Sequence, residues 1–252
     1  MRNFGLIGYP LGHSFSKKYF TAKFENEGTK DCQYDLYEIE DISLLPSIIR
    51  NNPELQGLNV TVPYKEKVLP FLDSLDPACE EIGAVNCIKI MDGKLKGYNT
   101  DYIGFKESLE NWLNGEKPYA LVLGTGGASK AVVKALKDLG ISYLMVSRNP
   151  GDDPGIISYE DLSKTKSVLD RNHLIINTTP LGTFPKTEEM PAINPDYISS
   201  MHKVYDLVYN PEKTFLMRSL EARGAVVKNG MEMLQLQAEA AWRIWIQNGN
   251  AL

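Results

Sequence analysis

The sequence predicts an α/β protein with two domains, and three observations lead to that prediction. Short apolar runs of strand length alternate with stretches of helical spacing along most of the 252 residues. A glycine-rich turn joins one apolar run directly to a helical stretch, which is typical of nucleotide-binding sheets. The length suits two domains of common size, and the N-terminal residues, roughly the first 100, already form an α/β unit.

The N-terminal part alternates strands and helices. Strands are expected at 4–8, 34–39, 58–62, 84–90 and 94–100. Helices are expected at 13–28, ending at Gly28, and at 42–52, before Pro53. The pair Asp92-Gly93 suits the positive φ angles of a two-residue turn, so the last two strands form a hairpin.

The strand at 58–62 is followed by a lysine in an unusual setting. Leu58, Val60 and Val62 alternate with polar residues, which predicts a strand with one buried face, and Pro63 ends it. Lys65 therefore lies just past a strand end. Taken alone, a lysine in this position is a solvated loop charge.

The C-terminal part reads as a parallel, doubly wound sheet. A linking helix is expected at 101–113, a second helix at 125–140 and a last one at 231–247. Buried strands are expected at 119–124, 141–147, 173–179 and 203–210. We predict that residues 1–101 and 230–252 form one domain and that residues 102–229 form the doubly wound domain.

Composition excludes several classes of protein. Hydrophobic residues make up 43% and charged residues 23%, and the net charge of -5 argues against a nucleic-acid or membrane surface. Cys32, Cys79 and Cys87 have neither metal-ligand spacing nor the even number of a disulfide framework. With no leader or membrane-spanning run in the sequence, we expect a cytoplasmic protein without a metal site.

The turn Gly124-Thr125-Gly126-Gly127-Ala128-Ser129 lies between a predicted strand and a predicted helix. Glycines let the backbone approach a pyrophosphate, and the helix N-terminus offers N–H groups and a positive dipole end. After the next strand comes Ser147-Arg148-Asn149, and an arginine there suits the 2′-phosphate of NADP. Asp152 and Asp153 follow closely and leave NAD open.

Several short polar motifs, in order, resemble those of shikimate dehydrogenase. They are GYPLGHSFS, NVTVPYKE, GAVNCI, GYNTD, NTTPLG, DLVYNP and the closing NG-MEMLQLQA. The resemblance runs from Gly8 to Gln237 and implies a substrate domain followed by an NADP-binding domain.

The resemblance implies a set of substrate-binding residues. Ser14 and Ser16 would hold the carboxylate of shikimate, and in an extended segment they would project to one side. The residues placed around the ring hydroxyls are Asn59, Thr61, Asn86, Gln237 and, nearby, Tyr209. The alternatives are helix-capping or loop roles for the serines and satisfied turn or sheet-edge roles for the others.

The same resemblance makes Lys65 and Asp101 the catalytic pair. A lysine ammonium can donate a proton to the alkoxide that develops during reduction, and the amine can accept one during oxidation. Asp101 would orient Lys65 and share the substrate hydroxyl. The alternative is a solvated salt bridge.

The cofactor residues are implied in the same way. Backbone contacts would come from Gly124, Gly126, Gly127 and Ala128, and Ser147, Arg148 and Asn149 would meet the phosphate. The residues expected to line the ribose and nicotinamide are Thr178, Leu207 and Gly230, although Leu207 equally suits a core.

The chain departs from the family pattern in three places: the first helix, the closing motif and the Asn-Arg-Thr signature for NADP, which appears as Ser147-Arg148-Asn149 and keeps the guanidinium. Lys17, Tyr19 and Phe20 stand where many relatives have proline and a His-Asn pair, and Glu232 replaces the usual glycine. Glu232 either brings a carboxylate near the cofactor or favours the helix dipole in a first turn.

We therefore expect an NADP-dependent oxidoreductase that interconverts 3-dehydroshikimate and shikimate, as a monomer or homodimer. An NAD-using quinate/shikimate dehydrogenase and a non-catalytic sensor of shikimate-like ligands are the alternatives. A methylene-tetrahydrofolate dehydrogenase shares the architecture, but the paired serines and GYNTD argue against it.

Overall fold

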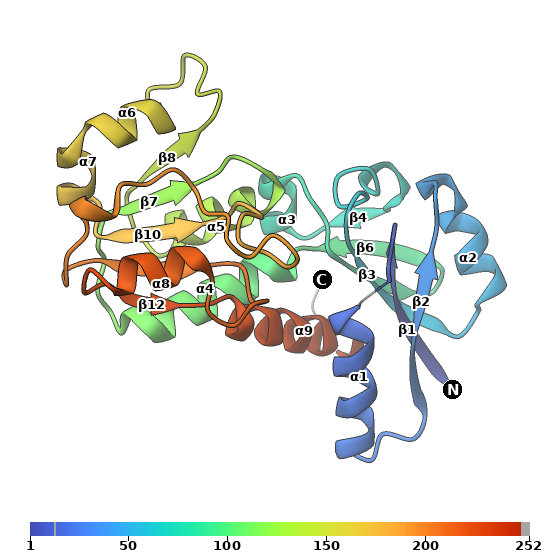
Figure 1. Ribbon diagram of the computed structural model, residues 1–252. Helices are drawn as coiled ribbons and strands as arrows, with labels where there is room; N and C mark the ends of the chain where they lie inside the picture. The colour runs from blue at the N-terminus through green and yellow to red at the C-terminus, as the bar shows by residue number, and fades with distance from the viewer. Residues whose placement is uncertain (13, 248–252) are drawn as a thin grey trace. The chain divides into compact units, whose positions relative to one another are not determined.

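The computed structural model describes residues 1–12 and 14–247, and its contacts divide the chain into two compact units (Figure 1). Unit 1 is Met1–Thr100 with Ala238–Leu252, and unit 2 is Asp101–Gln237. The chain therefore passes between the units inside two helices, α4 (Thr100–Leu113) and α9 (Met231–Ile246). His13 and residues 248–252, which belong to the predicted first domain, lie outside the described residues.

Unit 1 contains a six-stranded sheet of order β2-β1-β3-β5-β6-β4. Its strands are β1 (Arg2–Gly8), β2 (Cys32–Glu38), β3 (Leu55–Val60), β4 (Ser74–Leu75), β5 (Cys87–Met91) and β6 (Lys94–Tyr98). The first three are parallel, whereas β5 pairs antiparallel with β3 and β6. Asp92 and Gly93 have φ angles of 50° and 74°, so the predicted hairpin turn is confirmed.

Helices cover both faces of this sheet. The helix α1 (Phe15–Asn26) and the second half of α9 pack on one face, and α2 (Leu45–Asn51) and α3 (Pro77–Ile82) pack on the other. Within the described residues, three short 3₁₀ helices lie at Ile42–Leu44 and Leu69–Phe71 in unit 1 and at Pro195–Tyr197 in unit 2.

The central position of β3 corrects one expectation. Leu58, Asn59 and Val60 are all buried, because helices cover both sides of the strand. The strand also ends at Val60, and the Val62 side chain is 68% exposed. The expected alternation of buried and exposed residues up to Val62 was therefore wrong.

Unit 2 contains a second six-stranded sheet, of order β12-β11-β10-β7-β8-β9. Its strands are β7 (Ala120–Leu123), β8 (Tyr143–Ser147), β9 (Ile156–Ser158), β10 (Leu174–Asn177), β11 (Lys203–Asp206) and β12 (Val226–Lys228). Every pairing is parallel, which confirms the predicted doubly wound sheet.

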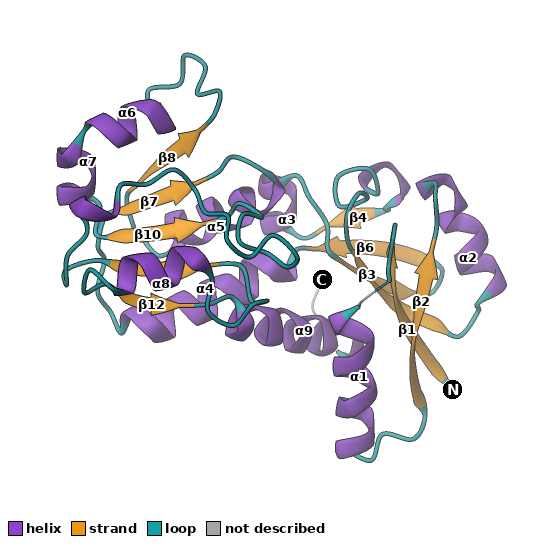
Figure 2. Cartoon of the chain, in the orientation of Figure 1, coloured by secondary structure: helices purple, strands orange, loops and turns teal. Residues whose placement is uncertain are grey.

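Two sets of helices flank this sheet (Figure 2). Buried residues of α4 and α5 (Gly127–Asp138) form a core with one face. The other face packs against α6 (Tyr159–Lys164), α7 (Lys166–Arg171) and α8 (Phe215–Glu221). The last three helices are short and were not predicted, because each has too few residues to show a helical period.

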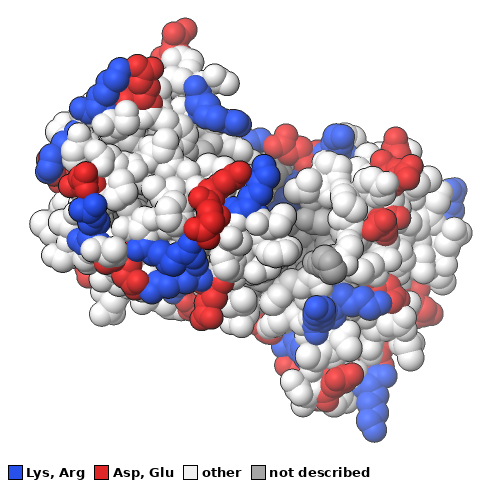
Figure 3. Space-filling model, in the orientation of Figure 1, with Lys and Arg blue, Asp and Glu red and all other residues white. Residues whose placement is uncertain are grey.

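The surface carries charges of both signs. In Figure 3, Lys and Arg side chains are interspersed with Asp and Glu side chains on the face in view. Within residues 1–12 and 14–247, no helix is both long and apolar enough to span a membrane.

We predict that Gly57→Ala destabilises unit 1 because the strand has no room for a side chain there. A Cβ at Gly57 would lie 2.3 Å from the indole of Trp245, whose Nε1 is held by a hydrogen bond to Ile88 O. The free energy of unfolding in urea should fall by roughly 1–3 kcal/mol. Gly12→Ala is the control, since nothing lies within 4 Å of its Cβ position. Equal stabilities of the two variants would contradict this packing.

Candidate functional site

The predicted substrate residues of unit 1 gather where its parallel strands end. The backbone N–H of Thr61, just after β3, donates to Ile7 O at 2.9 Å, so the ends of β1 and β3 are joined. Ser14 and Ser16 follow β1, and Asn59 lies inside β3. The carboxyl edge of a parallel sheet is where α/β proteins bind ligands.

Ser14 and Ser16 differ from their expected conformation. Ser14 is the N-cap of α1, and its hydroxyl accepts from Lys17 N at 3.3 Å. Ser16 already belongs to the first turn of that helix. The expected extended segment was therefore wrong, because the capping hydroxyl starts the helix between the two serines. Both side chains remain partly exposed.

Asn86 is fixed by the residue that precedes Asp101. The Thr100 backbone N–H donates to Asn86 Oδ1 at 2.6 Å, and Asn86 Nδ2 donates to Thr100 Oγ1 at 3.0 Å. Asn86 O also accepts from Val60 N and from Asn59 Nδ2. These bonds tie the start of α4 to both buried asparagines.

Lys65 lies in the turn that follows β3. Its backbone carbonyl accepts from Val85 N at 2.7 Å, which holds the turn beside the segment leading into β5. Asp101 is in the first turn of α4 and is the first residue of unit 2. Both side chains are partly exposed. Their catalytic pairing stays a prediction.

The predicted cofactor residues of unit 2 follow the ends of four adjacent parallel strands. Gly124 follows β7, Thr178 follows β10, Leu207 follows β11, and Ser147 ends β8. Backbone hydrogen bonds join these ends in a row, from Gly124 N to Val146 O, from Thr178 N to Leu123 O and from Leu207 N to Asn177 O. The structure thus brings these residues to one edge of the sheet.

The glycine-rich turn can hold a pyrophosphate. Gly126 is the N-cap of α5 and has no side chain to cap the first N–H groups. Residues 125–128 are exposed, and added Cβ atoms at Gly126 and Gly127 would meet nothing within 4 Å. Gly124 has a φ of 103°, and a Cβ there would lie 2.9 Å from Thr178 Oγ1. The backbone therefore fits a dinucleotide phosphate.

The residues after β8 fit the 2′-phosphate. The buried Ser147 hydroxyl donates to Asn149 O and accepts from Asn149 N, both at 3.2 Å, so it shapes this turn. Arg148 and Asn149 are exposed at its tip. Ser147 thus positions the turn, and the exposed Arg148 offers a positive charge that suits a phosphate.

Gly230 and Leu207 approach each other closely. A Cβ at Gly230 would lie 2.0 Å from Leu207 O, so only glycine fits at this point. Tyr209 is exposed, whereas Gln237 is buried and donates from Nε2 to Leu234 O of its own helix at 2.9 Å. Gln237 and Tyr209 belong to unit 2, whereas the other predicted ring-binding residues belong to unit 1.

Comparisons with known proteins agree with this architecture. A family model described as the shikimate dehydrogenase substrate binding domain matches residues 6–88. The curated shikimate dehydrogenase (NADP(+)) of Methanosphaera stadtmanae is 36% identical over 256 residues, which cover 96% of this chain and 90% of the relative. The chain belongs to the shikimate dehydrogenase family. The resemblance predicted from the motifs is confirmed.

Solved structures of the family share the fold. A chorismate mutase/shikimate 5-dehydrogenase fusion protein from Clostridium acetobutylicum has a TM-score of 0.87 and 35% identity, covering 98% of this chain and 91% of that one. The shikimate 5-dehydrogenase of Thermus thermophilus, in complex with NADP(H) and shikimate, has a TM-score of 0.84 and 30% identity, covering 98% and 94%. The predicted fold class is confirmed.

The departures from the family pattern near α1 are accommodated by packing and ion pairs. Lys17 pairs with Asp35 at 3.3 Å, and the Tyr19 hydroxyl donates to Glu239. Phe20 is fully buried in the core between α1, the sheet and α9. These residues therefore stabilise the helix that carries Ser16.

Glu232 bonds to side chains of β12 and α4 within unit 2. Its carboxylate pairs with Lys228 and accepts from Ser108 Oγ at 3.0 Å. Burial opposes ionisation, but these hydrogen bonds outweigh it and lower the pKa of Glu232. The same Ser108 hydroxyl lies 2.8 Å from the buried Tyr205 hydroxyl. Glu232 thus joins the start of α9 to α4 within unit 2.

Two buried polar groups at the cofactor edge were missed by the sequence analysis. Asp206 Oδ1 accepts from Asn177 Nδ2 at 2.8 Å and from Val208 N at 3.1 Å, and Oδ2 accepts from Thr214 Oγ1 at 2.6 Å. Asn177 Oδ1 in turn accepts from Thr179 N. This network fixes the loops that carry Thr178 and Leu207. Both residues lie in apolar runs that predict strands, and no local pattern marks the partners.

Two other features of the described residues were compared with the predicted sites: possible metal ligands and a surface cavity. Among residues 1–12 and 14–247, no three His, Cys, Asp or Glu side chains are grouped so as to hold a metal ion. A cavity of about 530 Å³ opens beside α1 and β2, and its lining, which includes Thr21, Phe24 and Gln33, contains none of the residues predicted to bind substrate.

We predict that Asp206→Asn changes how stability depends on pH. Burial raises the pKa of Asp206, and hydrogen bonds from Thr214, Val208 and Asn177 only partly offset it. The contribution of this carboxyl to stability is therefore present below its unfolded pKa and lost as pH rises through the folded pKa. The variant cannot ionise, so its unfolding free energy minus that of the unsubstituted protein should increase as the pH rises above about 4, the ordinary pKa of an aspartate.

Chemical denaturation at several pH values checks this, with the exposed Asp170→Asn as the control. A difference for Asp206→Asn that stays constant or shrinks with rising pH would contradict the assignment.

Proposed function

We propose that this chain catalyses the reversible NADPH-dependent reduction of 3-dehydroshikimate to shikimate, in aromatic amino-acid synthesis. One observation supports the proposal most strongly. Residues expected to bind substrate lie at one edge of the sheet in unit 1, and residues expected to bind the cofactor lie at one edge of the sheet in unit 2. The chain is also related to shikimate dehydrogenases over nearly its whole length.

The substrate side would act through hydroxyl and amide groups. Ser14 and Ser16 present hydroxyls near the N-terminus of α1, whose positive dipole end favours a carboxylate. Asn59, Thr61 and Asn86 offer amide and hydroxyl groups that match the alcohols of the ring, and Tyr209 and Gln237 would complete this set. Hydrogen-bonding side chains of this kind select a polyhydroxy acid over an apolar one.

Proton transfer would be the task of Lys65. During reduction its ammonium group donates to the oxygen at C3 as negative charge develops there, and during oxidation the amine accepts that proton. Asp101 would orient Lys65 and accept from the substrate hydroxyl.

The cofactor, when bound, supplies the hydride for C3. The N–H groups at the start of α5 would hold its pyrophosphate, and Arg148 its 2′-phosphate. Thr178, Leu207 and Gly230 would line the ribose and nicotinamide. The three cysteines are free, which suits the reducing cytoplasm as the compartment of action. The chain would act as a monomer or a homodimer.

We predict that Lys65→Ala lowers turnover by roughly 10²- to 10⁴-fold, since it removes the proton donor, while NADP binding stays unchanged. Reduction of NADP by shikimate and calorimetric titration with NADP check the two parts. Lys67→Ala is the matched control, because Lys67 is an exposed lysine of the same turn. Turnover of Lys65→Ala equal to that of the control would refute the catalytic role.

We predict that Arg148→Gln weakens NADP binding by about 10- to 100-fold and leaves NAD binding unchanged, because only NADP carries the phosphate that pairs with the guanidinium. Titration calorimetry with each dinucleotide measures this, with Arg223→Gln, an exposed arginine paired with Asp196 at 2.7 Å, as the control. An equal loss of affinity for both dinucleotides would contradict the assignment of Arg148 to the 2′-phosphate.

The same titration of the unsubstituted protein tests the alternative cofactor. Tighter binding of NAD than of NADP would favour the quinate/shikimate alternative, in which Asp152 or Asp153 would meet the ribose hydroxyls.

A further inference from the structure

A buried tyrosine of unit 1 forms a hydrogen bond with a residue of the candidate substrate site. Tyr34, in β2, is 3% exposed, and its hydroxyl donates to Asn59 Oδ1 at 2.7 Å. Burial raises the pKa of Tyr34 well above its ordinary value, so the phenol stays protonated and remains a donor.

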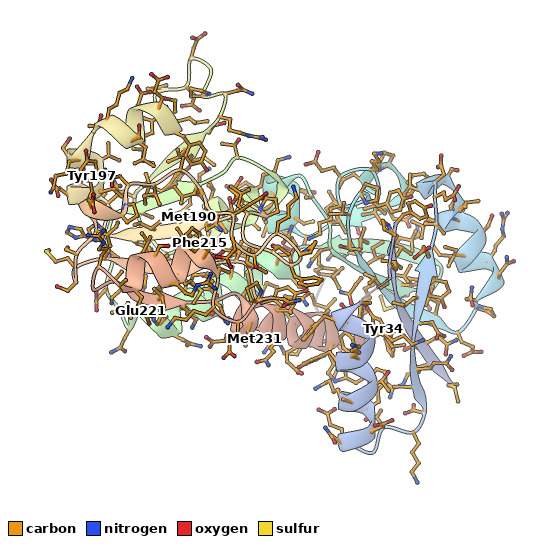
Figure 4. All side chains as sticks on the ribbon, in the orientation of Figure 1. Tyr34, Met190, Tyr197, Phe215, Glu221 and Met231 are labelled. Atoms are coloured by element: carbon orange, nitrogen blue, oxygen red, sulfur yellow. The ribbon has the colours of Figure 1, made fainter. Side chains whose placement is uncertain are left out.

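The ring of Tyr34 is held by aromatic packing. Phe20 of α1 stacks on it with centroids 4.7 Å apart and an interplanar angle of 13°. Trp245 of α9 lies 6.3 Å away on a tilted plane. Figure 4 labels Tyr34 beside α1, among the side chains of this core. The ring therefore has little freedom, and its hydroxyl is a fixed point.

This fixed hydroxyl and the Asn86 carbonyl together determine which way the Asn59 amide faces. An asparagine amide has an oxygen on one side and an NH₂ group on the other, and the two orientations have nearly the same shape. A protonated phenol that donates requires the oxygen on its own side. The Asn59 Nδ2 group is thereby turned the other way, where one hydrogen goes to Asn86 O at 3.3 Å. Nδ2 carries a second hydrogen, which can donate to a ligand oxygen.

We propose that Tyr34 is a positioning residue for the substrate site, which orients the Asn59 amide so that its NH₂ group faces a hydroxyl of the ring. The proposal rests on the proposed function for the identity of the ligand. Tyr34 itself touches no substrate: it acts through Asn59.

The substitution Tyr34→Phe isolates the hydroxyl, because the ring that packs against Phe20 is retained. We expect the KM for shikimate to rise roughly 3- to 10-fold, the effect of one misoriented hydrogen bond. The kcat and the dissociation constant for NADP should change by less than about twofold. Tyr205→Phe is the matched control, since it also removes a buried hydroxyl contact, to Ser108, but in unit 2. Tyr205→Phe should lose stability without a change in KM for shikimate.

A double-mutant cycle shows whether Tyr34 acts through Asn59. If it does, Tyr34→Phe adds nothing once the amide is absent, so Asn59→Ala and the double variant should have the same KM for shikimate. Additive losses would mean that Tyr34 affects binding by another route and would overturn the proposal. An unchanged KM for Tyr34→Phe alone would overturn it as well.

The orientation of Asn59 is also measurable without any ligand. The side-chain amide resonances of Asn59 in the free protein should shift in Tyr34→Phe and stay in place in Tyr205→Phe. If the unsubstituted protein neither turns over nor binds shikimate, the proposed function fails, and this spectrum still tests the positioning role. Unmoved Asn59 resonances in Tyr34→Phe would overturn the inference, whatever the protein's activity.

Discussion

Parallel pairing of strands is the constraint on which both candidate sites depend. In a parallel sheet all strands run the same way, so the residues after each strand meet at one edge although they lie far apart in the chain. In unit 2 the register of β7, β10 and β11 aligns Leu123, Asn177 and Asp206 as neighbours. The glycine turn, Thr178 and Leu207 follow directly, and this alignment produces a cofactor edge. In unit 1 the joined ends of β1 and β3 do the same for Thr61.

Buried hydrogen bonds then give these edges a defined shape. Asn86 in unit 1, and Asn177 and Asp206 in unit 2, are almost fully buried and bonded to residues that follow strands. A buried polar group is costly unless its partners are in place, so each network favours one arrangement of its loop. Local sequence does not determine the position of such loops. The hydrogen bonds of these buried side chains fix that position.

The sequence was sufficient for the longer elements and for the family, and insufficient for contacts between distant residues. Apolar runs such as 119–124 and helical spacing such as 231–247 are local signals, and both elements formed close to where they were expected. The predicted end of β3 was wrong, because burial of the strand on both faces prevailed over the local alternation. The predicted extended conformation of Ser16 was wrong, because Ser14 caps a helix that already includes Ser16. Tyr34 and Asn59 are 25 positions apart, so only the fold reveals that they meet.

The most direct test of this account is the absorbance of reduced nicotinamide, followed with purified protein, shikimate or quinate, and NADP or NAD in all four pairs. Rapid reduction of NADP by shikimate, with little for quinate or NAD, is the predicted result. Preference for NAD or comparable rates with quinate would place the protein in the quinate branch. No formation of reduced nicotinamide in any of the four pairs would contradict an enzymatic role and favour a sensor that binds shikimate-like ligands without turnover.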